Sequence, residues 1–306
     1  MKKPTHKRAF YTLVGCIAAL ALCLAAAMAL LLPAPAAQDI IIPGTRGGIH
    51  ATVQLPGKLA RSAEMPLAVL CHGFTGNRDG DGHFAPLADN LAAQGIATVR
   101  LDFPGCGDSD EPFTAYTLTN MEDDVESVIA YMQAAYGTGK TALVGHSMGG
   151  RLASLYPQAK GGIAALVLWS PANGAGLNGL EFLNIDDFAA VESLAAEAES
   201  SGTASAWGVE LSAEFFTQMR DSDPNAALRE AALPTLLTYS GHEGILSETT
   251  QAETIAAVQS LPAGEVVLEP FAAGNHNYLA EDAATAAALD KALRETTTQF
   301  LTEQLR

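Results

Sequence analysis

The sequence predicts an α/β fold in which a mostly parallel central sheet carries helices on both faces. Segments typical of strands alternate with segments of helical spacing along most of the chain. Strands separated by helices indicate a parallel sheet, because each crossover needs a helix to return the chain to the same end. Residues 67–71 are apolar without interruption, which is typical of a central strand buried on both faces.

The first half of the chain supplies the opening strands and three helices. The pair of early strands is followed by Pro56-Gly57, which ends the second of them. The strand after the first helix is ended by Pro104-Gly105. The second helix is indicated by Met121, Val125 and Met132, whose spacing places them on one side. We therefore expect strands over 39–43, 49–55, 67–71, 96–103, 141–145 and 163–169, and helices over 84–93, 117–136 and 148–156.

The second half contains one long departure from this alternation. Residues 171–233 are rich in Ala, Glu, Gly and Asn and are too long for a plain loop. We expect a mostly helical insertion whose aromatic residues serve mainly as its own core (Phe182, Phe188, Trp207, Phe215 and Phe216). The alternation then resumes, with strands expected over 234–239 and 265–270 and helices over 248–259 and 283–301.

Residues 1–36 form an N-terminal leader, and residues 37–306 form the body. The leader places Lys2, Lys3, Lys7 and Arg8 before an apolar run from Ala9 to Leu32 that contains no charge. That run is long enough to span a bilayer, which takes roughly 20 residues. The small residues that follow it at 34–36 also fit a signal-peptidase site. Membrane anchor and cleaved signal stay open, with lipidation at Cys16 as a third option.

Each of these options engages the membrane or the export machinery and places the body outside the cytoplasm. All 34 acidic residues lie beyond the leader, together with 13 of the 17 basic residues. Such an acidic body repels nucleic-acid phosphates and anionic lipid, which excludes nucleic-acid binding as a leading function. In an oxidising compartment Cys71 and Cys106 could pair, although two buried free thiols are the simpler expectation.

A nucleophile is indicated at Ser147, within Gly145-His146-Ser147-Met148-Gly149. The motif alone is weak, but an expected strand runs directly into it and an expected helix starts directly after it. Two glycines permit a sharp turn there, which projects the serine hydroxyl above the sheet. The backbone N–H groups of Met148 and of Phe74, which follows the strand at 67–71, could bind a developing oxyanion. We expect His72, beside Phe74, to be a structural hydrogen bonder.

A base and an orienting acid complete this arrangement. His276 lies in a polar loop between the last expected strand and the last helix, from where it could reach Ser147 across the carboxyl edge of the sheet. Glu243 follows the strand expected at 234–239, and the chain order Ser, Glu, His is that of a hydrolase triad. Glu248 is the nearest rival for the acid, but it has the position of a helix start.

These segments resemble the α/β-hydrolases, and among them the bacterial carboxylesterases and cinnamoyl (feruloyl) esterases. The likeness rests on residues 71–77, 100–109, 145–150 and 274–276 and covers roughly residues 49 to 301. It implies an α/β-hydrolase fold, the nucleophile at Ser147, the base at His276 and oxyanion donors at Phe74 and Met148. The family's acid is usually Asp, so Glu243 is a variant, and the insertion falls where the family carries its lid.

The expected function is therefore that of a serine carboxylesterase acting on a small ester, with no cofactor and no metal. An acyl-aminopeptidase or a lipase could use the same residues, and a catalytically inactive binding protein is a rival from another class. A loose phosphate-loop pattern at 134–141 is rejected because it follows a helix and enters a strand. Residues 77–82 resemble the first half of a twelve-residue calcium loop. The twelfth position, where such a loop needs a glutamate, is Ala88, so we expect a polar active-site loop there instead.

Overall fold

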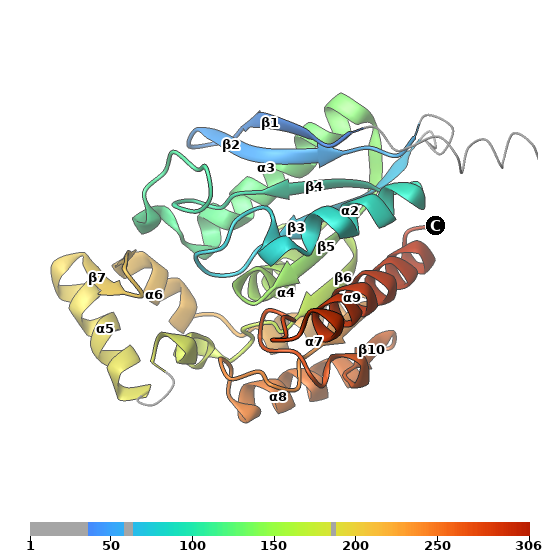
Figure 1. Cartoon of the computed structure of the whole chain (residues 1–306). Coiled ribbons are helices and arrows are strands. Elements are labelled where there is room, and N and C mark those ends of the chain that lie inside the picture. Colours follow the sequence, from blue (N-terminus) through green and yellow to red (C-terminus); the bar gives the residue numbers. More distant parts are fainter. Residues whose placement is uncertain (1–35, 58–63, 185–187) are drawn as a thin grey trace, which may run out of the picture.

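The sheet is the centre of the computed structural model, which describes residues 36–57, 64–184 and 188–306 (Figure 1). In these residues eight strands follow the order β1-β2-β4-β3-β5-β6-β9-β10. All neighbours from β4 to β10 pair in parallel, and only β1 and β2 run antiparallel to their neighbours. The strands are β1 (Gln38–Pro43), β2 (Gly48–Gln54), β3 (Met65–Cys71), β4 (Ala97–Leu101), β5 (Thr138–His146), β6 (Ile163–Trp169), β9 (Thr235–Thr238) and β10 (Gly264–Val267).

The central strands are buried on both faces, because alternate side chains enter two separate cores. In β3, Leu67 and Val69 belong to one core, whereas Ala68 and Leu70 belong to the other. This arrangement explains the uninterrupted apolar run of the strand, since neither face meets water. The expectation of a mostly parallel sheet with helices on both faces is confirmed.

Helices cover both faces of the sheet. Helices α2 (Phe84–Ala93) and α9 (Ala283–Gln304) pack side by side over one core. Helices α3 (Leu118–Tyr136), α4 (Met148–Ala159) and α8 (Glu248–Gln259) contribute to the other. Helix α3 begins where Thr117 accepts a hydrogen bond from the Asn120 N–H and ends at Gly137 in a left-handed conformation, two common helix-ending devices.

The segment between β6 and β9 forms more than helices. It contains the 3₁₀ segment η3 (Gly176–Leu183), helices α5 (Phe188–Ser201), α6 (Ala213–Arg220) and α7 (Pro224–Ala231), and the hairpin β7 (Thr203–Ala206) and β8 (Val209–Ser212). In Figure 1, α5, β7 and α6 project to one side of the sheet. Helix α7 instead packs against α4 and α8. The expected mostly helical insertion thus contains a β-hairpin as well.

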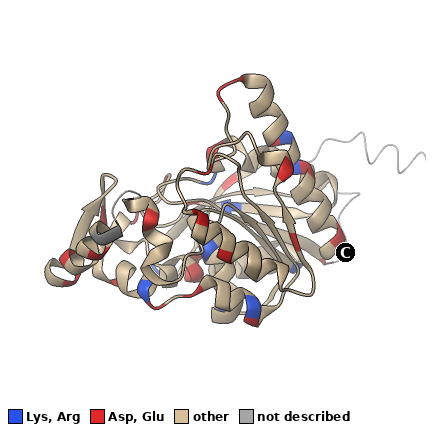
Figure 2. Ribbon diagram, turned by 90° about the horizontal axis from the view of Figure 1, so that it is seen from below, with Lys and Arg blue, Asp and Glu red and all other residues tan. Residues whose placement is uncertain are grey.

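The leader expected over residues 1–36 lies outside the described residues, apart from Ala36. Among the helices that the structure does describe, we find none with the length and apolar character that a membrane crossing requires. Figure 2 shows Asp and Glu residues on many of the helices and loops of the described body. The full sequence has 34 acidic residues against 17 basic ones. Cys71 and Cys106 are free and buried, as the simpler expectation held.

Candidate active site

Ser147 occupies the tight turn between β5 and α4. Its backbone has φ 54° and ψ −116°, a conformation that costs a residue other than glycine of order 1–3 kcal/mol. Backbone hydrogen bonds hold the turn: the Ser147 N–H donates to the Trp169 carbonyl at 2.9 Å, and the Ser147 carbonyl accepts from Ala172 at 3.0 Å. The strain is therefore maintained by contacts on both sides of the turn.

The glycines around Ser147 are required by close backbone approach. A methyl group on Gly145 would overlap the carbonyl oxygen of Gly149, and one on Gly149 would overlap the carbonyl oxygen of Cys71. Helix α4 thereby begins directly against the ends of β3 and β5. The Gly-x-Ser-x-Gly spacing thus has the structural setting that the sequence predicted for it.

His276 and Glu243 lie on two loops that are joined to each other. The loop after β9 is bonded to the loop after β10, because the Gly241 N–H donates to Phe271 at 3.0 Å and the His242 N–H donates to Gly274 at 2.9 Å. Within this pair of loops, His276 Nδ1 donates a hydrogen bond to Glu243 Oε1. Both side chains are nearly buried, with exposed fractions of 10% and 4%.

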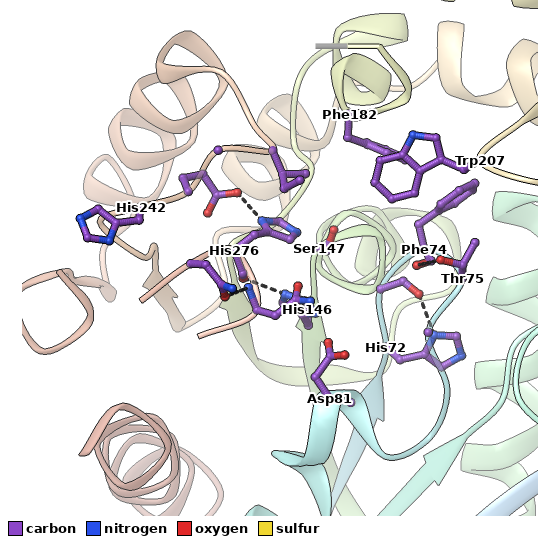
Figure 3. Close-up of a pocket in the computed structure, with 18 residues that line it drawn as sticks. His72, Phe74, Thr75, Asp81, His146, Ser147, Phe182, Trp207, His242 and His276 are labelled. Atoms are coloured by element: carbon purple, nitrogen blue, oxygen red, sulfur yellow. Dashed lines mark hydrogen bonds and ion pairs between the residues drawn. The ribbon is translucent and has the colours of Figure 1, made fainter. Parts of the chain in front are cut away.

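The Glu243 carboxylate has a second partner, the Ser240 hydroxyl, which donates to Oε2 at 3.3 Å. With Nδ1 of His276 bound to Glu243, Nε2 remains available on the other side of the ring, and Figure 3 shows the ring beside Ser147. Glu248, the rival for the acid, is exposed and is the first residue of α8. The structure thus brings Ser147, His276 and Glu243 together and leaves Glu248 apart.

His146, next to the serine, contacts the His276 loop. Its Nε2 donates to the His276 carbonyl at 3.1 Å, and the two ring centroids are 5.0 Å apart. Burial, reinforced by the neighbouring His276, lowers the pKa of His146 to about 3, so that the ring is neutral. His146 thus joins the serine turn to the loop that carries His276.

His72 and Gly73 shape the opposite wall of the site. A methyl group on Gly73 would lie 3.1 Å from Ser147 Cβ, which is a tight contact, so glycine favours the close approach of this loop to the serine. His72 Nδ1 donates to the Gly73 carbonyl at 2.7 Å, and its Nε2 accepts from the Phe103 N–H at 3.1 Å. Burial lowers the pKa of His72 to about 4. These contacts agree with the expectation that His72 is a structural hydrogen bonder.

The two residues expected to provide oxyanion donors flank the serine. Phe74 follows Gly73 in the loop after β3 and lines the cavity. Met148 is the first residue of α4, and its side chain is fully buried. The first N–H groups of a helix have no partner within the helix, so the Met148 N–H can donate a hydrogen bond to a ligand. The positive end of the α4 dipole lies at the same place.

A cavity of about 470 Å³ opens above Ser147. One wall is aromatic: the ring centroids of Phe74 and Phe182 are 5.1 Å apart, and those of Phe182 and Trp207 are 5.6 Å apart (Figure 3). Such a cavity suits a small organic ligand. The remaining lining side chains are mostly polar or catalytic candidates, namely Thr75, Asp81, His242, Glu243, Asn275, His276 and Asn277.

Several lining residues are not predicted by the sequence, among them Trp207 and Asp81. Trp207 is one of the aromatic residues that the sequence predicts as the insertion's core, and Phe215 and Phe216 are indeed fully buried. Trp207, in contrast, is 51% exposed, at the tip of the β7–β8 hairpin. Asp81 lies in the segment expected to be a polar active-site loop, but nothing in the sequence singled it out from its neighbours.

Solved structures with the same architecture include Est1E from Butyrivibrio proteoclasticus in complex with ferulic acid. That structure matches with a TM-score of 0.69 and 21% identity over 87% of this chain and 98% of that chain. An esterase of Pyrococcus furiosus matches with a TM-score of 0.63 and 15% identity over 89% of this chain and 92% of that chain. At these identities the likeness shows the fold alone.

A curated relative and a family model add sequence evidence. The 2-(acetamidomethylene)succinate hydrolase of Mesorhizobium japonicum is 32% identical over 105 residues, which are 33% of this chain and 35% of that protein. The chain thus matches about a third of this relative's length. The model of the alpha/beta hydrolase family matches residues 68–301, which carry all five candidate site residues. Since that match spans most of the sequence, the chain belongs to the alpha/beta hydrolase family.

Proposed function

We propose that this protein is a serine carboxylesterase that uses Ser147 as nucleophile, His276 as base and Glu243 as the orienting acid. One observation carries the proposal: the buried hydrogen bond from His276 to Glu243 lies beside a serine held in a strained turn at the start of a helix. A base that is oriented by a third group and faces a hydroxyl is the arrangement that activates a serine.

The reaction follows from these positions. His276 Nε2 takes the proton from the Ser147 hydroxyl as its oxygen attacks the ester carbonyl, and Glu243 stabilises the imidazolium that forms. The N–H groups of Phe74 and Met148 bind the negative oxygen of the tetrahedral intermediate. His276 then gives its proton to the leaving alcohol, and water enters by the same route to release the acid. Every proton passes through His276, so this sequence of steps uses no cofactor.

The aromatic wall guides the choice of substrate. Phe74, Phe182 and Trp207 present ring surfaces to the cavity, and such surfaces favour a flat apolar group. We therefore expect hydroxycinnamoyl esters, together with short-chain esters, to be the first substrates to try. The ferulic acid bound to Est1E supports this choice by analogy with a protein of the same fold. Acyl-aminopeptidase and lipase activities remain the runners-up within the same machinery.

The proposal is tested by labelling with a fluorophosphonate, which reacts with activated serines. We expect wild type to be labelled and Ser147→Ala not to be. Turnover of a p-nitrophenyl ester should fall on the order of 10⁴-fold or more in this variant, because triad members act as a unit.

A matched control is Ser154→Ala. Ser154 is also buried on α4, but its hydroxyl donates to the Gly150 carbonyl at 2.9 Å, away from the cavity. This variant should be labelled like wild type. Equal labelling of wild type and Ser147→Ala would overturn the mechanism. A wild type without ester turnover would favour the alternative of a binding protein with a hydrolase fold.

A further inference from the structure

Asp81 places an unpartnered carboxylate in the cavity. It is the middle residue of the short 3₁₀ segment η1 (Gly80–Gly82), and its φ of 53° lies in the left-handed region. Figure 3 shows its side chain directed toward the catalytic residues. Within the described part of the chain, this carboxylate has no hydrogen bond and no ion pair, and it is exposed. Its backbone conformation is therefore set by the turn rather than by a side-chain partner.

The neighbouring polar side chains of this loop are all engaged elsewhere. Arg78 pairs with Asp102, and Asp79 pairs with Arg100 at 2.9 Å. Asn77 Oδ1 accepts from the Asp79 N–H at 2.8 Å. Among the described residues that line the cavity there is no Lys or Arg. The Asp81 charge therefore acts on the cavity without an opposing cation in its lining.

The location of Asp81 indicates which part of an ester it would meet. His83, directly after η1, donates from Nε2 to the Asn277 carbonyl at 2.9 Å, and this bond fastens the turn to the His276 loop. The leaving oxygen of an ester must lie near His276, because that ring supplies its proton. The aromatic wall lies across Ser147 from this loop (Figure 3). Asp81 therefore borders the alcohol side of the cavity.

We propose that Asp81 is a specificity-determining residue that selects esters by the charge of their alcohol portion. It favours an alcohol that carries a positive charge and disfavours one that carries a carboxylate. This inference rests on the proposed esterase function, which it deepens by naming the class of alcohol. The physical reason is the attraction or repulsion between the Asp81 carboxylate and a charge in the substrate, with no Lys or Arg in the described lining of the cavity to cancel it.

The test uses acetate esters that differ in the charge of the alcohol. Acetylcholine is cationic, 3,3-dimethylbutyl acetate has the same shape without the charge, and acetoxyacetate is anionic. The quantity measured is kcat/KM for each charged ester divided by that for the neutral ester, so that effects common to all esters cancel. Wild type is compared with Asp81→Asn, because asparagine tolerates a left-handed backbone and has nearly the same shape.

We expect Asp81→Asn to lower the cationic-to-neutral ratio about three- to fivefold and to raise the anionic-to-neutral ratio by a similar factor, as expected for charges several ångströms apart near solvent. Asp81→Lys should move both ratios further in the same directions. Melting temperatures report whether each variant is folded. Asp110→Asn is the control, since it changes net charge equally at a side chain that is 91% exposed and outside the cavity. Its ratios should match those of wild type.

The outcomes separate this inference from the function on which it rests. Ester turnover that depends on Ser147, together with ratios that are the same in wild type, Asp81→Asn and Asp81→Lys, would overturn the role of Asp81 alone. Equal shifts in Asp81→Asn and Asp110→Asn would assign the effect to net charge and would also overturn it. Absence of Ser147-dependent turnover of every ester would overturn the proposed function and this inference with it.

Discussion

Four histidines line the cavity, of which His242 is exposed; among the three buried ones, the contacts suit only one to act as a base. Both ring nitrogens of His72 are used by backbone groups, and burial lowers its pKa to about 4. His146 is bound to the His276 carbonyl, and its pKa is lowered to about 3. His276 alone has a carboxylate on Nδ1 and lies with its other nitrogen open beside the serine. Hydrogen bonding thus distinguishes three residues that are alike in burial.

Substitution of Glu243 tests the proposed triad. Glu243→Gln keeps the shape of the side chain but removes its negative charge, so the imidazolium of His276 loses its stabilising partner. The amide also favours the wrong tautomer of the ring. We expect kcat on a single ester to fall by roughly 10³- to 10⁴-fold. The measurement is the steady-state turnover rate, with the melting temperature as a check on folding.

Glu248→Gln is the matched control for Glu243→Gln. It makes the same chemical change in an exposed residue at the start of α8. Its effect on turnover should be close to nil. If Glu248→Gln were the damaging change and Glu243→Gln were harmless, the assignment of the acid would be wrong.

The sequence could predict the catalytic candidates better than the cavity lining. Ser147 is predicted by a motif, and His276 is predicted by its position in a loop after a strand. The regular alternation of strands and helices makes it possible to locate such loops in the sequence. Asp81 could not be chosen over Asp79, because the difference lies in tertiary contacts: Arg100 engages Asp79 and leaves Asp81 open. Side chains that line a cavity depend on packing that local sequence does not encode.

At the scale of elements, a buried arginine joins the inserted segment to the helix that begins after Ser147. Arg151 on α4 is fully buried and donates to the carbonyls of Ala172 at 2.8 Å and Gly174 at 2.6 Å. It also donates to the Ser222 hydroxyl at 2.7 Å, near the far end of the same segment. Burial lowers the pKa of Arg151 to about 9, which still leaves it charged at neutral pH. Arg151 thereby fixes the beginning of the inserted segment, at Gly174, and a part near its end, at Ser222, to α4.

The hairpin within this segment shows where sequence patterning was insufficient. The strands β7 and β8 are four residues each, and their turn is made by Trp207 and Gly208, both with positive φ. Hairpin turns of this kind are usually signalled by Asn-Gly or Asp-Gly, so a Trp-Gly pair does not predict one. The long strands and helices of the body were predictable because their apolar runs and helical spacing extend over several residues.

Trp207 should contribute to the binding of an aromatic substrate, because it forms part of the aromatic wall of the cavity. Removing an aromatic ring contact costs about 1 kcal/mol. Trp207→Ala should therefore lower kcat/KM for methyl ferulate by about five- to tenfold, and the loss on methyl acetate should be clearly smaller. Both values come from steady-state kinetics on the two esters.

Leu268→Ala is the matched control, because it removes an exposed apolar side chain outside the cavity. It should leave the ratio of the two kcat/KM values as in wild type. Equal losses on both esters in Trp207→Ala would argue against an aromatic subsite formed by the hairpin.

For the molecule as a whole, the high negative charge of the body is independent of its hydrolase fold. Figure 2 shows Asp and Glu residues on many of its helices and loops, whereas the acidic residues in the described lining of the cavity are Asp81 and Glu243, which is bound to His276. A high net charge favours solubility and does not specify a fold.

We propose that the leader of residues 1–36 has a role in export. The described sheet begins with β1 at Gln38, and every candidate site residue lies beyond it. Removal of residues 1–36 should therefore leave kcat/KM for a p-nitrophenyl ester and the melting temperature of the body within about twofold and a few degrees of the full chain, since local losses far from a site are small. In native cells, the full chain should be found by immunoblotting of fractions in the membrane or the medium. A pool confined to the cytosol would contradict the export role, while a body that cannot fold without its leader would contradict the boundary at residue 36.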